Sequence, residues 1–387
     1  MIVYVTTQGA TIVKEGRHLL VKKDGATYRT LFTYKLQQLI LCGRIELTAP
    51  ARSFLLKEQI DTVFLQKDGR YLGRFATGES KNVFLRKKQF DLIDDSGFKL
   101  RIAHQILTGK LLNMVTVLQR IGRTRKNREI EPCIRQIRSC LHNMSSAESV
   151  DSLMGYEGAA AAAYFSGFKL GLNDDFGFTR RVRRPPTDPV NSVLSLLYTM
   201  LINRVYAAIR VVGLDPYPGI LHTMDYGRQG LPLDLVEEFR SILADTLTLS
   251  LFNLRSLQKK DFIQDDLEPA DGDDKLTVES TDPVEKILND PVGRMSNCDA
   301  EGLFDIPSRQ IVEDNHYGNA SAKIRIRLTA EAFRKVLTVF EKKLATEFFH
   351  PLAEKRMSYG DALVYQVRQY RRVVEGELAD YQPLLLK

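Results

Sequence analysis

The hydrophobic pattern of this chain changes its period once, near residue 95, and this change limits the folds that the chain can adopt. Before it, short runs rich in β-branched residues predict strands at 3–5, 10–14, 18–22, 39–41, 62–65 and 71–75. After it, apolar residues recur at steps of three and four, which predicts helices at 98–124, 131–144, 149–170, 190–212 and 232–251. The sequence therefore predicts an α+β protein, with a β-rich domain at 1–92 and an all-α domain at 97–387.

Turn and cap residues add detail to this division. Residues 67–70 have the composition of a hairpin turn, and short helices are expected at 37–38 and 52–59. The first domain is thus expected to be a small sandwich or folded-over sheet. Helical periodicity returns at 328 and continues to about 377.

Composition excludes several classes of protein. Hydrophobic residues make up 44% and charged residues 27% of the chain, which is ordinary for a globular protein. No uninterrupted apolar run approaches the roughly 18–20 residues that span a bilayer, and the first residues do not resemble a signal peptide. A cytoplasmic protein with no membrane association is expected. The four cysteines form neither a CxxC pair nor a disulfide framework, so reduced thiols are expected.

One segment differs from its surroundings in charge. Residues 261–305 contain fourteen acidic and three basic residues, a local charge of −11. We expect an acidic, mobile insert at about 261–318. Because the whole chain carries +7, the chain outside 261–305 carries +18. A strongly basic body is typical of a protein that binds nucleic acid. Like-charge repulsion from the phosphates would keep the acidic insert away from the bound nucleic acid.

Glu157 is the only charged residue between 152 and 168, in a stretch that contains glycines and five consecutive alanines. The small residues predict a central helix that other backbones approach from nearly every side. A carboxylate buried there needs a cation, a metal or a proton to neutralise it. The structural alternative is an ion pair between Glu157 and a buried arginine.

A second group of polar residues follows the apolar segment 219–221. His222 precedes a glycine-rich loop, and Asp234, Glu237 and Glu238 share one face of the next helix at i, i+3 and i+4. Glu157, His222 and either Glu237 or Asp234 would form a mixed oxygen and nitrogen site suited to Mn²⁺ or Mg²⁺. Such sites most often act on phosphates. The alternative is a core histidine with satisfied hydrogen bonds.

Arginines cluster in two places. Four of them lie in a loop between the aromatic segment 176–178 and the prolines 185–186, namely Arg180, Arg181, Arg183 and Arg184. A second basic patch occupies 120–128. Both suit the phosphate backbone of a nucleic acid, and a merely solvated charged face is the alternative for each.

Four motifs in the same order resemble a known family. Residues 82–89 (NVFLRKKQ), 153–158 (LMGYEG), 184–191 (RPPTDPVN) and the block 222–240 are similar to the CRISPR-associated integrase family, the metal-dependent DNA enzymes of CRISPR adaptation. The resemblance covers nearly the whole chain. Gly230 departs from it, because many relatives have serine there, and so does the acidic insert.

The resemblance implies an activity and a set of partners. The expected enzyme is an integrase and endonuclease that joins the 3′ ends of protospacer DNA to the CRISPR repeat by transesterification and also cleaves double-stranded DNA. It implies a homodimer formed through domain 1–92 and a small second CRISPR-associated protein that bridges two dimers. Two alternatives stay open: a structure-selective DNA nuclease with no integrase role, and a non-catalytic DNA-binding scaffold.

The resemblance also implies roles for single residues. Glu157, His222 and Glu237 fall on the family's metal ligands, and Asp234 falls on the acid one turn earlier, an orienting or alternate ligand. Arg228 matches a basic residue expected near the scissile phosphate, and Arg240 ends the same motif. With the arginines of the 180–184 loop, these last two are the expected DNA-binding residues.

Overall fold

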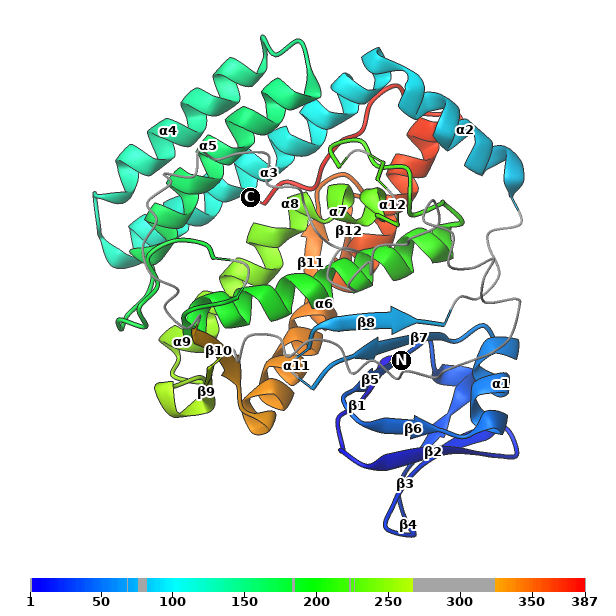
Figure 1. The fold of residues 1–387 in the computed structure, drawn as a ribbon. Helices are drawn as coiled ribbons and strands as arrows, with labels where there is room; N and C mark the ends of the chain where they lie inside the picture. The colour runs from blue at the N-terminus through cyan, green and yellow to red at the C-terminus, as the bar shows by residue number, and fades with distance from the viewer. Residues whose placement is uncertain are drawn as a thin grey trace, which may run out of the picture.

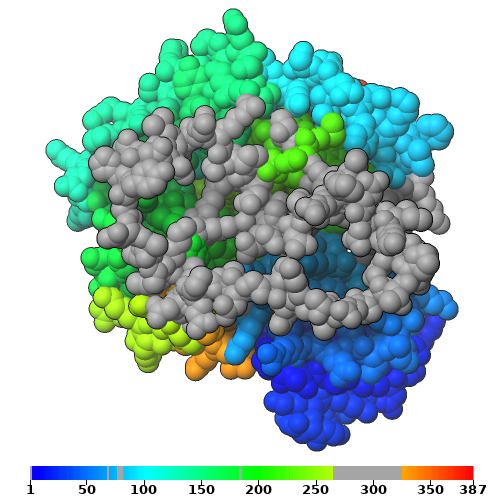
Figure 2. All heavy atoms as spheres, viewed as in Figure 1, coloured from blue at the N-terminus to red at the C-terminus, as the bar shows by residue number. Residues whose placement is uncertain are grey.

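The computed structural model describes residues 2–67, 69–75, 82–182, 185–222, 224–225, 227–266 and 324–386. Figure 1 shows a sheet-rich N-terminal part (blue) beside a larger helical body, and Figure 2 shows the N-terminal part protruding from one end of the same face. The protein has the predicted α+β fold, with the sheets first and the helices after them.

The N-terminal part consists of two stacked sheets closed by one helix. The first has the order β1 (Ile2–Val5), β5 (Gln38–Cys42), β7 (Asp61–Leu65), β8 (Tyr71–Arg74). The second has the order β4 (Ala26–Phe32), β3 (His18–Lys23), β2 (Ala10–Glu15), β6 (Ile45–Leu47). Apolar residues of both sheets share one small core with helix α1 (Ala49–Lys57), which confirms the expected sandwich.

The strand predictions were correct except in three places. β4 and β6 were not expected, and the helix predicted at 37–38 is wrong, because Gln38 begins β5. The Gln38 side chain is buried and donates a hydrogen bond of 2.5 Å to Asp61 on the neighbouring strand β7. A buried polar residue with a partner on the next strand breaks the alternation on which the prediction relied.

The five predicted helices are present, and two helices lie in the helical region predicted from 328 to about 377, whereas the helix at 83–94 was not expected. The helical body contains α2 (Val83–Asp94), α3 (Ser96–Arg125), α4 (Ile130–Met144), α5 (Val150–Lys169), α6 (Pro189–Val212), α7 (Gly230–Leu235), α8 (Glu237–Phe239), a π-helical turn (Arg240–Asp245), α9 (Thr246–Asn253), α11 (Ala330–Ala345) and α12 (Tyr359–Glu375). Helix α2 packs on α3 and α12, so the helical body begins at Val83 rather than at 97.

The second part was predicted to be all-α, and this prediction is wrong. Two antiparallel pairs of strands lie within it: β9 (Phe262–Asp266) with β10 (Ile324–Leu328), and β11 (Glu347–His350) with β12 (Lys355–Ser358). The first residues of the acidic insert predicted at about 261–318 form β9, which pairs with β10. From residue 267 on, the insert lies outside the described residues, and so does its predicted mobility.

Helix α6 runs through the middle of the body. It bears on the prediction that the chain does not associate with a membrane. By length and composition alone it is apolar enough to cross a membrane, yet 78% of its most apolar window is buried inside the protein. It begins as predicted at Asp188–Pro189, where the Asp188 side chain accepts a hydrogen bond from the Asn191 backbone, and it ends at Gly213. The burial is that of a core helix.

Buried polar contacts join the two parts of the protein. On α6, Arg204 forms an ion pair with Glu341 of α11 and lies 3.3 Å from both the Tyr4 hydroxyl of β1 and Oε1 of Gln38. The guanidinium of Arg74, on β8, stacks 3.5 Å from the ring centre of Tyr206. These contacts fix the sandwich to the same helix that carries the core of the body.

The C-terminal tail, residues 381–386, is held against α8 by one buried carboxylate. Glu238 accepts hydrogen bonds from the Tyr381 hydroxyl (2.8 Å), the Leu384 backbone (2.7 Å) and the side-chain amide of Gln366 (3.1 Å). Asn113 of α3 donates to the Glu238 carbonyl oxygen and to that of Leu384. The tail and α3 therefore set the position of α8.

Burial raises the pKa of Glu238 from 4.5 to about 7, against the opposing effect of its three donors. Between these pH values the folded state keeps a proton that the unfolded state releases, so this carboxyl destabilises the fold as the pH rises. The loss amounts to about 3 kcal/mol between pH 4.5 and 7. We predict that Glu238→Gln removes this decline, as measured by urea unfolding from pH 5 to 8.

Glu148→Gln, at an exposed position, is the matched control and should leave the decline unchanged. Parallel profiles for the wild type and Glu238→Gln would contradict the prediction.

Candidate active site

A lysine that was not singled out from the sequence lies between two of the predicted site residues. The ammonium nitrogen of Lys110 on α3 donates a hydrogen bond of 2.5 Å to Oε1 of Glu157 on α5. It also forms an ion pair of 2.6 Å with Oε2 of Glu237 on α8. The side chains of Lys110, Glu157 and Glu237 are 7%, 15% and 4% exposed. Three helices therefore meet at a buried cluster of three charges.

The expected cation beside Glu157 is a lysine rather than an arginine. Lys110 lies on the buried stripe of α3, which also includes Ile106, Leu107 and Leu111. A charged residue at an apolar position of the helical period was the signal in the sequence that marked Lys110 as a buried group with a partner.

Helix α5 carries Glu157 on its buried side, and the prediction that this helix is central was wrong. Gly155 and Gly158 are exposed, and a Cβ atom at either would meet nothing within 4 Å. Tyr164, two turns after Glu157 on the same face, donates a hydrogen bond of 2.8 Å to the buried Asp245. This bond fixes the rotation of α5 and so the direction in which Glu157 points.

His222 and Asp234 form a buried pair. Nδ1 of His222 lies 2.7 Å from Oδ1 of Asp234, which also accepts from the His222 backbone, while the other Asp234 oxygen accepts from the Ile220 backbone. An acceptor at Nδ1 places the ring proton there and leaves the lone pair on Nε2. Nε2 is buried and has no hydrogen-bond partner among the residues that the structure describes. Asp234 thus orients the histidine, and its own oxygens are occupied by the loop.

The loop that carries His222 depends on two glycines in contact. A Cβ atom at Gly230 would lie 2.7 Å from the His222 carbonyl oxygen and 2.8 Å from the Cα atom of Gly219. No side chain fits there without moving the backbone. In this chain Gly230 is therefore required by close approach, which explains the departure from serine noted in the sequence.

Glu237 is surrounded by cations. Burial would raise its pKa, but the charges of Arg240 and Lys110 lower it below its ordinary value. Arg240 lies 3.3 Å from Oε1 of Glu237, is 8% exposed and stacks over Tyr198. Glu237 is thus held as a carboxylate, and Arg240 acts in the structure as its partner rather than as an exposed contact for DNA.

Asn191 of α6 fixes the arginine loop. Its side-chain oxygen accepts hydrogen bonds of 2.9 Å from the Arg181 guanidinium and from the Val182 backbone, and its amide donates to the Arg180 carbonyl and to Asp188. Arg181 also donates to Ser195 and stacks over Tyr198. The guanidinium of Arg181 therefore holds the loop in place.

The remaining basic residues differ in exposure. Arg180 is exposed, Arg228 is 5% exposed, and Arg183 and Arg184 lie outside the described residues. In the 120–128 patch, Arg125 donates a hydrogen bond of 2.6 Å to the Gly171 carbonyl.

The structure thus brings Glu157 and Glu237 together around Lys110, and places His222 in a separate buried pair with Asp234. Within the part of the chain that the structure describes, no three His, Cys, Asp or Glu side chains lie close enough together to hold a metal ion. The donor types nevertheless fit a hard divalent cation. Two carboxylates share one cation, and the unpartnered Nε2 of His222 is an unused ligand atom.

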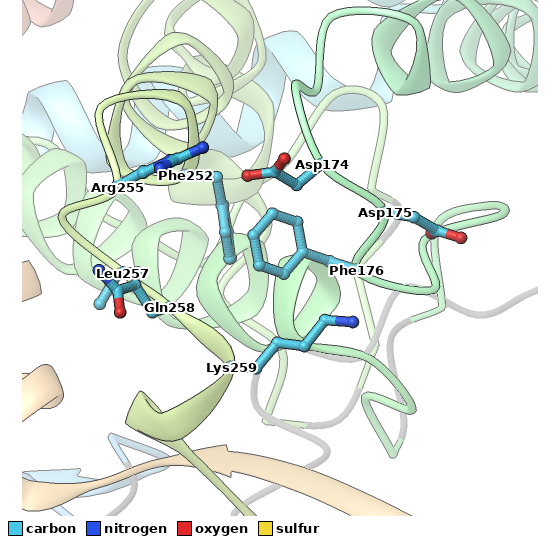
Figure 3. Close-up of a pocket in the computed structure, with 8 residues that line it drawn as sticks. All are labelled: Asp174, Asp175, Phe176, Phe252, Arg255, Leu257, Gln258 and Lys259. Atoms are coloured by element: carbon cyan, nitrogen blue, oxygen red, sulfur yellow. The ribbon is translucent and has the colours of Figure 1, made fainter.

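A pocket of about 560 Å³ lies elsewhere, between the loop after α5 and the end of α9. Figure 3 shows the rings of Phe176 and Phe252 side by side in it, tilted by 55° with their centres 4.6 Å apart, with Asp174 and Lys259 nearby. It lies beyond the end of α5, roughly 18 Å along the helix from Glu157 at 1.5 Å per residue. This pocket is not part of the charged cluster.

A family model and individual related proteins both match this chain and indicate the same family. The family model described as "CRISPR associated protein Cas1" matches residues 3–270. "CRISPR-associated endonuclease Cas1 3" of Thermus thermophilus is 31% identical over 390 residues, covering 100% of this chain and 97% of its own. "CRISPR-associated endonuclease Cas1 1" of Moorella thermoacetica is 26% identical and covers 99% of this chain and 98% of its own.

Solved structures share the fold at lower identity. A casposase bound to integration product has a TM-score of 0.75 at 18% identity and covers 98% of this chain and 92% of its own. A CAS1 protein from Thermotoga maritima has a TM-score of 0.72 at 20% identity, covering 100% and 99%. A Cas6-RT-Cas1–Cas2 complex has a TM-score of 0.76 at 23% identity and covers 100% of this chain and 36% of its own. By its sequence, its fold and the four motifs, this chain belongs to the Cas1 family of CRISPR-associated proteins.

Proposed function

We propose that this protein is a metal-dependent DNA endonuclease and integrase of CRISPR adaptation, which joins protospacer 3′ ends to the CRISPR repeat by transesterification. The relatives that match it over nearly their whole length are named as endonucleases, and a casposase bound to integration product has the same fold. Its strongly basic body suits a DNA substrate.

The observation that carries this proposal is the unpartnered Nε2 of His222, in a site where two carboxylates already share a cation. Glu157, His222 and Glu237 would hold Mn²⁺ or Mg²⁺, and Asp234 would orient the histidine. When bound, the ion would neutralise charge on the phosphodiester and favour ionisation of the attacking 3′ hydroxyl.

The other residues of the site act on the protein and on the DNA. Arg240 keeps Glu237 ionised, and Asn191 holds the loop that presents Arg180 at the surface. Arg180, Arg183 and Arg184 would bind the phosphate backbone, which positions the strand without selecting a sequence. Arg228 is buried and would contact only a phosphate that enters the site. Arg181 would contribute by anchoring that loop.

The assembly is also part of the proposal. We infer a homodimer formed through the N-terminal sandwich, with a small second CRISPR-associated protein that bridges two dimers, acting in the cytoplasm. A Cas6-RT-Cas1–Cas2 complex that contains the same fold supports a partner of this kind.

The direct test supplies protospacer DNA, a plasmid with leader and repeat, Mn²⁺ and the cognate small partner. The proposal predicts joined products. Hydrolysis without joined products would favour a structure-selective nuclease, and DNA binding with neither joining nor hydrolysis would favour a non-catalytic scaffold.

Two substitutions separate a ligand from its orienting partner. We predict that His222→Ala lowers both joining and cleavage by about 10²-fold or more, because a ligand atom is lost. Asp234→Asn should weaken the affinity for Mn²⁺ by about 10- to 100-fold, because the imidazole is no longer fixed, with joining partly restored at high Mn²⁺. His142→Ala, at an exposed position of α4, is the control. Full activity of His222→Ala would refute the metal site.

Asn191→Ala tests the arginine loop. The substitution removes the hydrogen bonds from Asn191 to the Arg180 carbonyl and from the Arg181 guanidinium to Asn191, so the loop is held less firmly. We therefore predict about tenfold weaker DNA binding, with an almost unchanged salt dependence because no positive charge is lost. Arg180→Ala should instead reduce the slope of log K against log salt by about one unit. Asn143→Ala, at an exposed position of α4, is the control. Thermal unfolding checks that Asn191→Ala remains folded. Unchanged affinity of Asn191→Ala would show that the loop needs no such anchor.

A further inference from the structure

The distances around Lys110 limit what else can occupy its place. Its nitrogen lies 2.5 Å from the Glu157 oxygen and 2.6 Å from the Glu237 oxygen, so these two oxygens are at most 5.1 Å apart. A Mg²⁺ ion binds oxygens at about 2.0–2.1 Å, so one that bridged both would hold them within roughly 4.2 Å. A metal ion at that distance from the Glu237 oxygen would lie at most about 4.7 Å from the ammonium nitrogen, so the two cations would repel each other strongly.

With the ammonium group in place, one potential metal-ligand atom of the site is unused. Lys110 contacts both carboxylates, while Nε2 of His222 remains buried with no partner. A ligand set of two carboxylates and one imidazole nitrogen is complete only with a cation that binds all three. Lys110 thus satisfies the site electrostatically but not as a set of ligands.

The position of Lys110 is set by the fold rather than by chance. Asn113, one turn further along α3, donates to the backbone of Glu238, the residue after Glu237. This contact fixes the register of α3 against α8. Without a positive charge here, two carboxylates would lie close together out of water, which is strongly unfavourable.

We propose that Lys110 is an internal cation that holds Glu157 and Glu237 together in the metal-free protein and is displaced from between them when the divalent metal binds. Lys110 is thus a positioning residue, which keeps the site assembled at the expense of metal affinity. The inference rests on the proposed function, because it assumes that Glu157, His222 and Glu237 hold a metal.

The consequence is a competition between two cations for one gap. The wild type must break two short ionic contacts to bind Mn²⁺, whereas a variant with an uncharged side chain at position 110 breaks none. The same variant loses the counter-ion of its metal-free state. Metal affinity and metal-free stability must therefore change in opposite directions.

The test compares wild type with Lys110→Met, which has a similar length and no charge. Mn²⁺ binding is measured at pH 8 by electron paramagnetic resonance of the free ion, and thermal unfolding is recorded with and without Mn²⁺. We expect Lys110→Met to melt lower without metal, to bind Mn²⁺ about tenfold more tightly, and to gain more in Tm from Mn²⁺ than the wild type does.

Two further variants sharpen the comparison. Lys110→Gln, in case Lys110→Met does not fold, should change affinity in the same direction. Lys87→Met removes an exposed lysine that pairs with Asp91 and should change neither property.

The outcomes separate the inference from the function on which it rests. If the wild type binds Mn²⁺ and the Lys110 variants bind it equally or more weakly, Lys110 does not compete with the metal and the inference is wrong. If neither the wild type nor the variants bind Mn²⁺, the proposed metal dependence itself fails.

Discussion

A buried ammonium group shared by two carboxylates is the contact on which the helical body depends. Lys110 of α3 joins Glu157 of α5 to Glu237 of α8, and Figure 1 places these three helices beside one another. Three buried charges are stable together only when their geometry is well defined, because each would be costly alone. The surrounding structure supplies that definition through Asn113, through the C-terminal tail on Glu238 and through the bond from Tyr164 to Asp245.

The histidine is positioned by a separate set of contacts. Asp234 fixes the imidazole, and the contact between Gly219 and Gly230 brings the two ends of the loop together. The arginine loop is linked to the same region through one ring, since Arg181 and Arg240 both stack on Tyr198. The histidine and the arginine loop thus rest on α6 and on the segment from α7 to α9, which also carries Glu237 of the charged cluster.

The sequence predicted those features that follow from period and from isolated charge. The change of hydrophobic period predicted the order of sheets and helices, and a single acid among alanines marked Glu157. It did not predict Lys110, because a lysine on a long helix is usually exposed, and only its place on the buried stripe marked it. Arg181 was assigned to DNA from the charge of its loop and Arg240 from the family resemblance, whereas tertiary contacts direct both inward. Gln38 misled the prediction because its partner, Asp61, is distant in sequence.

The proposed site requires that a divalent metal ion replace the Lys110 ammonium group in the gap between Glu157 and Glu237. A crystal soaked with Mn²⁺ and measured at the manganese absorption edge tests it most directly. The account predicts an anomalous peak within bonding distance of Glu157, Glu237 and Nε2 of His222, with the Lys110 ammonium moved out from between the carboxylates. A peak elsewhere, with Lys110 still bridging Glu157 and Glu237, would contradict it.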